Sequence, residues 1–197
     1  MTDRLAAPAD LGTLLGVPDL DPALAALLVE IATSIVQSAT GRPPQRILAV
    51  ADEEITLTGT TDSWLQLPQL PVTVVASVAL DGVTLSSGVA GSGPSTWRLR
   101  GSRLWRGSGW QTYVGEPSEV TVVYSHGYAT GHQGLELARS AVLGLCRAVP
   151  ANREGLSQLR VDDFSATYDA MAARMEASPA LQRALQWTYG HAAGAIR

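Results

Sequence analysis

The hydrophobic pattern of this chain changes its period twice, and this limits the folds open to it. Apolar residues recur every three or four positions from 21 to 39, every second position from about 47 to 125, and every three or four positions again from 134 to 149. The first spacing is typical of an amphipathic helix, and alternation is typical of a half-buried strand. We therefore expect an α+β protein.

Both helices carry signals at their ends. Asp21 is a good N-cap and Pro22 a good first helical residue, while Gly41 ends the first helix before a Pro-Pro pair. Pro150 ends the second helix in the same way. Neither helix can bury its apolar stripe alone, so we expect the two to pack on each other as a small helical core.

The intervening segment is predicted to be an inserted antiparallel β lobe over residues 47–128. Asp81-Gly82 lies between two apolar runs and predicts a two-residue hairpin, because both positions tolerate a positive φ. Residues Val120 to Tyr124 form the clearest strand of this lobe.

The other parts follow from this division. Residues 1–46 should supply the N-terminal helices of the core, residues 129–150 a further core helix, and residues 151–197 a C-terminal arm. Within the arm, alternation over 161–168 predicts an extended segment. Ser178-Pro179 is an N-cap and first-residue pair that opens a last helix.

The arm carries more large apolar side chains than an isolated segment of its length can bury. We therefore expect it to dock on a neighbouring molecule. The candidates for this partner interface are Phe164, Tyr168, Met171, Met175, Leu181, Leu185, Trp187 and Tyr189.

Composition excludes several classes of protein. With 46% hydrophobic residues, 16% charged residues and a net charge of −4, the chain can bury a core and is too acidic to hold nucleic acid over its whole surface. No segment is expected to span a membrane, and the N-terminus lacks a secretory signal pattern. Cys146 is the single cysteine and lies in an apolar helical pattern, which favours a packed core residue over a nucleophile.

The sequence shows no pattern of an enzyme, and we expect no catalytic residue, metal site or cofactor. Phosphate-binding loops, dinucleotide-binding glycines and hydrolase motifs are absent. His126 is best explained as the end of a strand, the alternative being a general base without an evident orienting acid. His132 and Glu136 share a spacing of four, but no third metal ligand is evident.

A segment rich in arginine and tryptophan is the most unusual local feature. Gly101-Ser102 suits a two-residue hairpin turn with Gly at its first position. Pairing outward from this turn sets Arg100 opposite Arg103. Because like charges opposite each other are unfavourable, we expect an anionic group near the tip.

The same register predicts two stacking pairs. Arg98 lies opposite Trp105, and Trp97 lies opposite Arg106. We expect the arginine of each pair to stack on the tryptophan in a cation–π contact. The hairpin has three possible roles at this point. It can be an exposed hairpin that closes the lobe, a contact with another protein, or a platform for nucleic acid or sugar. The contact candidates are Trp97, Arg98, Arg100, Arg103, Trp105 and Arg106.

Several segments, in their order along the chain, resemble one known family. The chain is similar to the head-to-tail adaptor (head-tail connector) proteins of long-tailed phages and related gene-transfer particles. The likeness is carried by Leu11-Gly-Thr-Leu-Leu-Gly-Val-Pro, by 21–41 followed by Arg-Pro, by Leu70-Pro-Val-Thr-Val-Val-Ala-Ser-Val-Ala-Leu-Asp-Gly, by Val120-Thr-Val-Val-Tyr-Ser-His-Gly-Tyr before a helix, and by Val161-Asp-Asp-Phe-Ser-Ala-Thr-Tyr before a helix ending in Trp-Thr-Tyr.

The resemblance implies a helical core that bears a β lobe, in a structural virion protein with no catalytic activity. It implies a ring, typically of twelve copies, that is made in the host cytoplasm and sits in the virion neck. The portal protein and the tail-side neck (stopper) protein would be its partners, and double-stranded DNA would pass through the ring without sequence-specific binding. Residues 86–116 have no counterpart in the resemblance.

A second hypothesis treats the β lobe as a binding module. Here an arginine- and tryptophan-lined platform would hold a glycan or a nucleic acid. The aromatic members of this platform would be Trp64, Trp97, Trp105 and Trp110.

Overall fold

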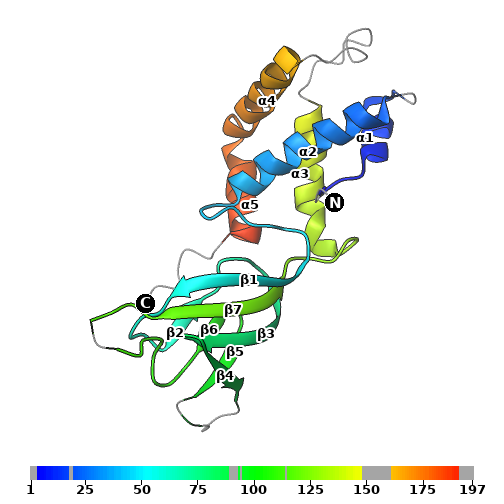
Figure 1. The fold of residues 1–197 in the computed structure, drawn as a ribbon. Coiled ribbons are helices and arrows are strands. Elements are labelled where there is room, and N and C mark those ends of the chain that lie inside the picture. The colour runs from blue at the N-terminus through cyan, green and yellow to red at the C-terminus, as the bar shows by residue number, and fades with distance from the viewer. Residues whose placement is uncertain are drawn as a thin grey trace. The chain divides into compact units, whose positions relative to one another are not determined.

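The computed structural model describes residues 4–17, 20–88, 93, 95–113, 115–147 and 161–190, with side chains from 165 onward in the last range. The chain divides into two compact units, Met1–Leu48 with Tyr128–Arg197, and Ala49–Gly127. The first unit is helical and the second is a mostly antiparallel, curled sheet, which confirms the expected α+β class (Figure 1). The C-terminal helices belong to the helical unit and form no separate arm.

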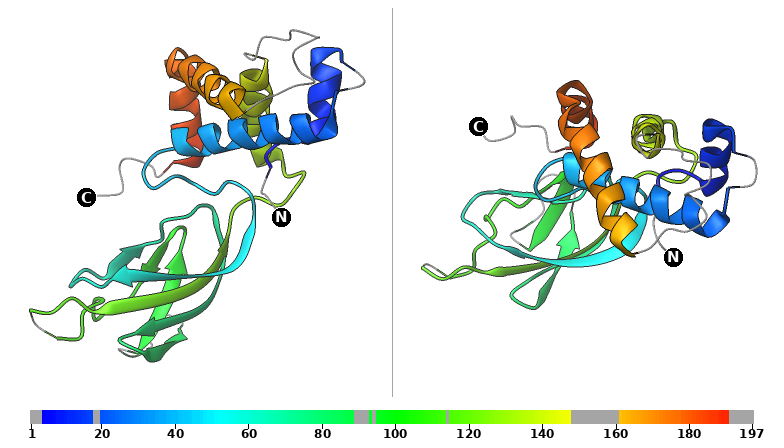
Figure 2. Two further views of the ribbon diagram at one scale, coloured as in Figure 1. Left: turned by 45° about the horizontal axis from the view of Figure 1, so that its top comes forward. Right: turned by 90° about the horizontal axis from the view of Figure 1, so that it is seen from above.

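The helical unit is built around one long helix. The helices α1, α3, α4 and α5 all contact α2, which lies across them (Figure 2). In chain order the elements are α1 (Pro8–Leu15), α2 (Pro22–Ala39), the short 3-10 helix η1 (Gln133–Leu135), α3 (Glu136–Cys146), α4 (Val161–Glu176) and α5 (Pro179–Tyr189).

Helix α2 begins as its sequence predicts. The Asp21 carboxylate accepts a hydrogen bond from the Ala23 N–H at 2.9 Å, and Pro22 occupies the first turn. Along its length the helix buries Leu24, Ala25, Leu28, Val29, Ile31, Ala32, Thr33, Ile35 and Val36. These buried residues lie on more than one face of the helix, so other elements must cover α2 from several sides.

Among the described helices, α2 alone is long and apolar enough to cross a membrane by composition, with a mean hydropathy of 1.5. This differs from the expectation that no segment approaches a membrane span. Half of the helix is buried inside the unit, and the core helix of a soluble protein passes the same test.

Helix α4 corrects the prediction of an extended segment over 161–168. The segment is the first half of a 16-residue helix. Its buried residues are Thr167, Met171 and Met175, which are four positions apart and lie on one helix face. The apparent alternation comes from apolar residues at positions 164, 166 and 168, but Ala166 and Tyr168 are exposed in the structure. Packing of the buried face against α2 and α3 favours the helix.

Tyr189 at the end of α5 fixes the last helix to the beginning of α3. Its hydroxyl donates to the Gly134 carbonyl at 2.6 Å and accepts from the Ala138 N–H at 3.2 Å. That N–H lies in the first turn of α3, where no partner exists within the helix. The side chain is only 4% exposed, and this burial raises the pKa of the Tyr189 hydroxyl.

We predict that Tyr189→Phe destabilises the helical unit by about 1–3 kcal/mol, because the Ala138 N–H and the Gly134 carbonyl lose a buried partner. Chemical denaturation followed by circular dichroism measures the loss. Tyr168→Phe is the matched control, since Tyr168 is 44% exposed and its change should stay within about 0.5 kcal/mol. Equal stability of the two variants would contradict the role given to Tyr189.

The second unit is one seven-stranded sheet with the order β1-β7-β3-β4-β5-β6-β2. All its pairs are antiparallel except β4 with β5, which is parallel and differs from the wholly antiparallel lobe expected. The strands are β1 (Val50–Thr58), β2 (Trp64–Gln66), β3 (Val72–Leu80), β4 (Val83–Ser87), β5 (Thr96–Arg100), β6 (Arg103–Trp105) and β7 (Glu119–His126).

The hairpin between β3 and β4 confirms the Asp81-Gly82 prediction. Leu80 pairs with Val83, and both turn residues have positive φ, 49° at Asp81 and 78° at Gly82. The Asp81 carboxylate also accepts hydrogen bonds from the Thr112 hydroxyl and the Glu119 N–H. These bonds join the hairpin to the start of β7 and hold the pKa of Asp81 below its ordinary value.

We predict that Asp81→Asn removes part of the acid sensitivity of the β unit. A carboxylate with a lowered folded-state pKa stabilises the fold above its unfolded value, near 3.8, and loses that contribution as the pH falls through the folded value. The variant should therefore unfold at lower urea than wild type at pH 7, and this difference should shrink towards pH 2. Asp62→Asn, at an exposed position, serves as the control. A gap that stays constant with pH would refute the linkage.

Candidate functional site

The residues expected to form a partner interface in the C-terminal segment do not share one surface. Met171, Met175, Leu185 and Tyr189 are buried in the core of the chain's own helical unit. Leu181 is partly buried against the same core. Burial of these five side chains therefore needs no neighbouring subunit, because α4 and α5 pack on α2 and α3. The side chain of the sixth candidate, Phe164, lies outside the described residues.

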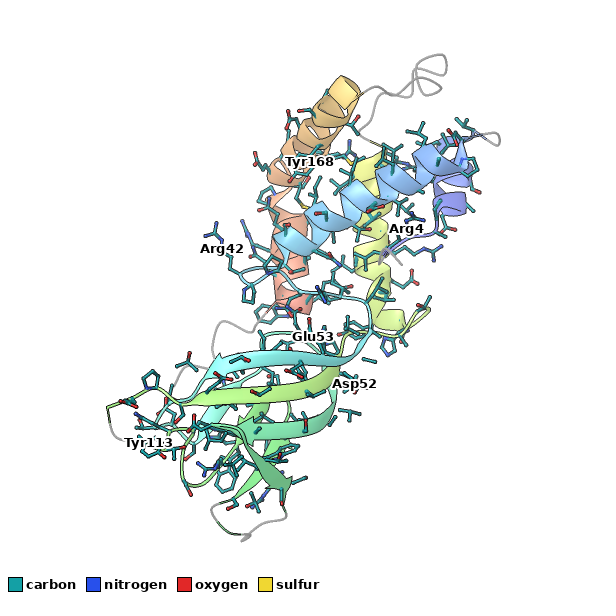
Figure 3. All side chains as sticks on the ribbon, viewed as in Figure 1. Arg4, Arg42, Asp52, Glu53, Tyr113 and Tyr168 are labelled. Carbon is teal, nitrogen blue, oxygen red and sulfur yellow. The ribbon has the colours of Figure 1, made fainter. Side chains whose placement is uncertain are left out.

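The two remaining candidates are exposed. Trp187 on α5 is 92% exposed. Tyr168 on α4, which Figure 3 labels, is 44% exposed. Leu185 and Tyr189 flank Trp187 at a distance of two positions, which on a helix lies on nearly the opposite side. Since both flanking residues are buried, α5 is held so that the Trp187 indole faces away from the helical core.

The arginine-rich hairpin has the predicted register around its turn. Gly101 has a φ of 61°, and Arg100 pairs with Arg103, Leu99 with Leu104 and Arg98 with Trp105. The Arg98 guanidinium lies 5.0 Å from the centroid of the Trp105 ring, which confirms this cation–π contact.

The second predicted stacking pair is wrong. Trp97 is 5% exposed and its indole N–H donates to the Leu85 carbonyl at 3.2 Å, so it is a core residue of the sheet. Arg106 donates to the Gly109 carbonyl instead, and burial lowers the pKa of its guanidinium. Trp97 is two positions from Leu99 on β5, so strand alternation places both side chains on the inward face of the sheet.

The close approach of Arg100 and Arg103 is relieved in a way that the sequence did not predict. The Nε of Arg103 donates to the Gln66 side-chain carbonyl at 3.0 Å, and the Gln66 amide donates to Ser102. A neutral side chain from β2 thus orients Arg103, while Arg100 stays exposed. These contacts show how the pair is accommodated in this chain, and the expected anionic group remains a prediction.

Burial also lowers the number of tryptophans that can take part in the proposed surface platform. Trp97 and Trp110 lie in the hydrophobic core of the β unit, and the Trp110 indole donates to the Ser63 carbonyl. Only Trp64, at 46% exposed, and the partly exposed Trp105 are available at the surface. A platform of four tryptophans is therefore excluded, whereas a smaller surface of two indoles beside arginines is present.

His126 has a carboxylate partner that the sequence analysis missed. Its Nε2 lies 2.7 Å from a Glu53 carboxylate oxygen, and the His126 side chain is 0% exposed. A bulge in β1 between Val50 and Glu53, with Asp52 at a φ of 50°, turns Glu53 toward this histidine (Figure 3 labels both acids). The partners are far apart in sequence, so only the strand register reveals the pair.

The His126–Glu53 pair has the geometry of a structural contact. The ring lies 5.3 Å from that of Tyr124, and its Nδ1 makes no hydrogen bond to the residues that the structure describes. A general base must reach a substrate, and an imidazole without exposed surface cannot do so. The pair satisfies one nitrogen of a buried ring at the end of β7.

We next consider the histidine and carboxylate side chains elsewhere in the described part of the chain as metal ligands. Within the described ranges, no group of three or more His, Cys, Asp or Glu side chains is arranged to hold a metal ion. His132 accepts a hydrogen bond from the Gly134 N–H at 2.9 Å and so caps η1. Its spacing of four from Glu136 is explained without a metal, because His132 acts as a helix cap.

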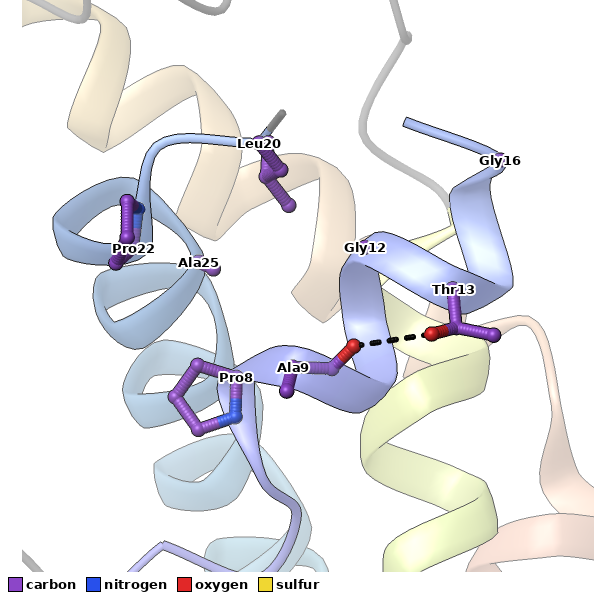
Figure 4. Close-up of a pocket in the computed structure, with 8 residues that line it drawn as sticks. All are labelled: Pro8, Ala9, Gly12, Thr13, Gly16, Leu20, Pro22 and Ala25. Atoms are coloured by element: carbon purple, nitrogen blue, oxygen red, sulfur yellow. Dashed lines mark hydrogen bonds between the residues drawn. The ribbon is translucent and has the colours of Figure 1, made fainter. Parts of the chain in front are cut away.

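A groove of about 670 Å³ lies between α1 and the start of α2 (Figure 4). Its walls are apolar and small, with the Thr13 hydroxyl turned back onto the Ala9 carbonyl at 3.3 Å. The described residues that line it bring no convergent set of polar groups together, whereas specific ligand sites usually have one. The lining residues are Pro8, Ala9, Gly12, Thr13, Gly16, Leu20, Pro22 and Ala25.

Comparison with known proteins adds no residue to these sites. The chain matches no protein-family model, and no curated protein matches it.

Cys146 is packed in the helical core, as its sequence context indicates. It is 0% exposed, its sulfur lies 3.7 Å from the Leu28 carbonyl oxygen, and burial raises the pKa of the thiol to about 12. The thiolate is the reactive form of cysteine, so this thiol is protected both by burial and by protonation.

We predict that Cys146 in the native protein at pH 8 reacts with a thiol reagent at least about a hundredfold more slowly than in urea. The raised pKa keeps the folded thiol protonated at that pH, whereas the thiol in urea has an ordinary pKa and is partly ionised. Release of a coloured thiol product, followed with time, gives both rates. Rapid stoichiometric labelling of the folded chain would show that Cys146 is accessible.

Proposed function

We propose that this chain is a structural head-to-tail adaptor of a tailed phage or a related particle. In this proposal it forms a ring in the virion neck between the portal and the tail-side connector, and DNA passes through the ring. The support is the order of the resembling segments along most of the chain, together with an α+β fold of the kind the resemblance implies. The proposal assigns the chain no catalytic step.

The observation that carries the proposal is the exposed indole of Trp187. A tryptophan at 92% exposure leaves a large apolar surface in water, and tryptophan is among the residues most enriched in the energetic centres of protein interfaces. Leu185 and Tyr189 already fix α5 in the core, so the indole is presented without further ordering. We assign this surface to a neck partner.

The helix that carries Trp187 is suited to such a contact. Because α5 is anchored through its buried face, substitutions on its exposed face leave the core of the unit intact. The neck assembly can therefore be tested with a point substitution. Deleting the whole C-terminal segment would instead remove Met171, Met175, Leu185 and Tyr189 from the core and unfold the unit.

We predict that Trp187→Ser prevents incorporation of the chain into virion necks while changing the free energy of unfolding by less than about 0.5 kcal/mol. Particles assembled without the chain are supplied with wild type or variant, and electron microscopy scores necks and attached tails. Thr188→Ala, an exposed neighbour on the same helix, is the control and should incorporate as wild type does. Necks that form normally with the Ser variant would overturn the role of Trp187, and no incorporation of wild type would overturn the adaptor proposal.

A further inference from the structure

The charged side chains of the β unit are segregated along the sequence. The segment 49–62 contains carboxylates and no basic residue, whereas the segment 82–115 contains arginines and no carboxylate. In the strand order the two segments lie towards opposite edges of the sheet. The first contains the edge strand β1, and the second contains β5 and β6, of which β6 lies next to the other edge strand, β2.

Three of the four arginines in the segment 82–115 lie on one outward face. Trp64 pairs with Trp105, which pairs with Arg98, and in the next row Gln66 pairs with Arg103, which pairs with Arg100. The leucines that alternate with them, Leu65, Leu99 and Leu104, pack in the core, so the two rows face outward. We call this surface the arginine face: Trp64, Gln66, Arg98, Arg100, Arg103 and Trp105.

The carboxylates form a second outward face on β1 and β7. Glu54 and Glu119 are exposed, and they alternate with Ile55 and Val120, which lie in or against the core. Asp52 is exposed at the bulge in β1. We call this surface the acidic face: Asp52, Glu54 and Glu119.

The two faces point away from each other. Leu104 of β6 and Val120 of β7 belong to the same hydrophobic core, which the curled sheet encloses between them. Strands that contribute inward to one core from its two sides must present their outward faces in opposite directions. The β unit therefore has a basic side and an acidic side.

We infer that the β unit binds a second copy of this chain head to tail, with the arginine face of one copy on the acidic face of the next. An interface between two different faces of identical subunits continues from copy to copy and closes only as a ring. The inference deepens the proposed function and rests on it, because a neck ring is the assembly that brings the copies together.

The chemistry of the arginine face favours a protein partner over nucleic acid. Carboxylates outnumber arginines in the β unit and in the whole chain, whose net charge of −4 disfavours the approach of a polyanion such as nucleic acid. Tryptophan and arginine are the residues most typical of protein-interface hot spots. The complementary charges are present on the chain itself.

The arginine face is also ordered before it binds. Arg98 is stacked on Trp105, and Arg103 is held by Gln66. Fixing long side chains in advance lowers the entropy lost on association. Arg100 is exposed beside them and makes the sharpest probe, because its substitution removes neither of these contacts.

The test uses charge reversal on each face of the full-length chain. At low ionic strength, wild type should self-associate in sedimentation experiments, and salt should weaken this association. Arg100→Glu and Glu54→Arg should each weaken it about tenfold or more. An equimolar mixture of the two variants should recover the association. The intact arginine face of the Glu54→Arg variant meets the intact acidic face of the Arg100→Glu variant as in wild type, and the two reversed faces are complementary to each other.

Matched controls lie on the exposed surface of the helical unit. Arg183→Glu and Glu176→Arg change the net charge by the same amounts and should associate as wild type does, singly and mixed. A monomeric wild type, unaffected face variants, or equal recovery by the control pair would overturn the inference. So would an Arg100→Glu variant that loses binding of a single-stranded oligonucleotide and keeps its self-association.

The result separates this interface from the adaptor proposal. A face variant that fails to associate in solution yet enters necks normally overturns the interface and leaves the adaptor proposal standing. A wild-type chain that associates through these faces but never enters necks overturns the adaptor proposal and leaves the interface intact.

Discussion

The burial of α2 by helices from both ends of the chain is the constraint on which the helical unit depends. α1 precedes α2 in the sequence, whereas α3, α4 and α5 all follow the β unit, and each packs on α2. Its buried positions spread over more than one side, so no single partner can cover them. The C-terminal helices are therefore part of the core, and Tyr189 fixes the last of them to the start of α3.

This arrangement explains how a sheet of 79 residues can be inserted between α2 and α3. The chain leaves and re-enters the helical unit at neighbouring positions, because the Tyr128 N–H donates to the Ile47 carbonyl and Leu48 bridges to Tyr128. An insertion whose two ends lie side by side leaves its host's core undisturbed. The sheet keeps a separate core, centred on residues such as Trp110 and Tyr124.

Local signals predicted the elements whose structure is decided locally. The Asp21 cap, the Asp81-Gly82 turn and the register around Gly101-Ser102 all depend on residues close in sequence. Prediction failed where distant contacts decide: alternation over 161–168 gave way to a helix that packs on α2, and Trp97 turned inward to reach the Leu85 carbonyl. Pairing of Glu53 with His126 needs a bulge in β1, for which the sequence has no signal.

The same burial decides where partners can bind. Because α4 and α5 pack on the core, most of their large apolar residues are buried, whereas the large apolar side chain of Trp187 faces water. The β unit instead presents surfaces defined by charge, with arginines and carboxylates on opposite sides of one core. Because the two units have separate cores, these surfaces can be altered independently. An apolar contact made by α5 would keep its strength in salt, whereas a contact between the charged faces would weaken, so ionic strength distinguishes which surface holds a given partner.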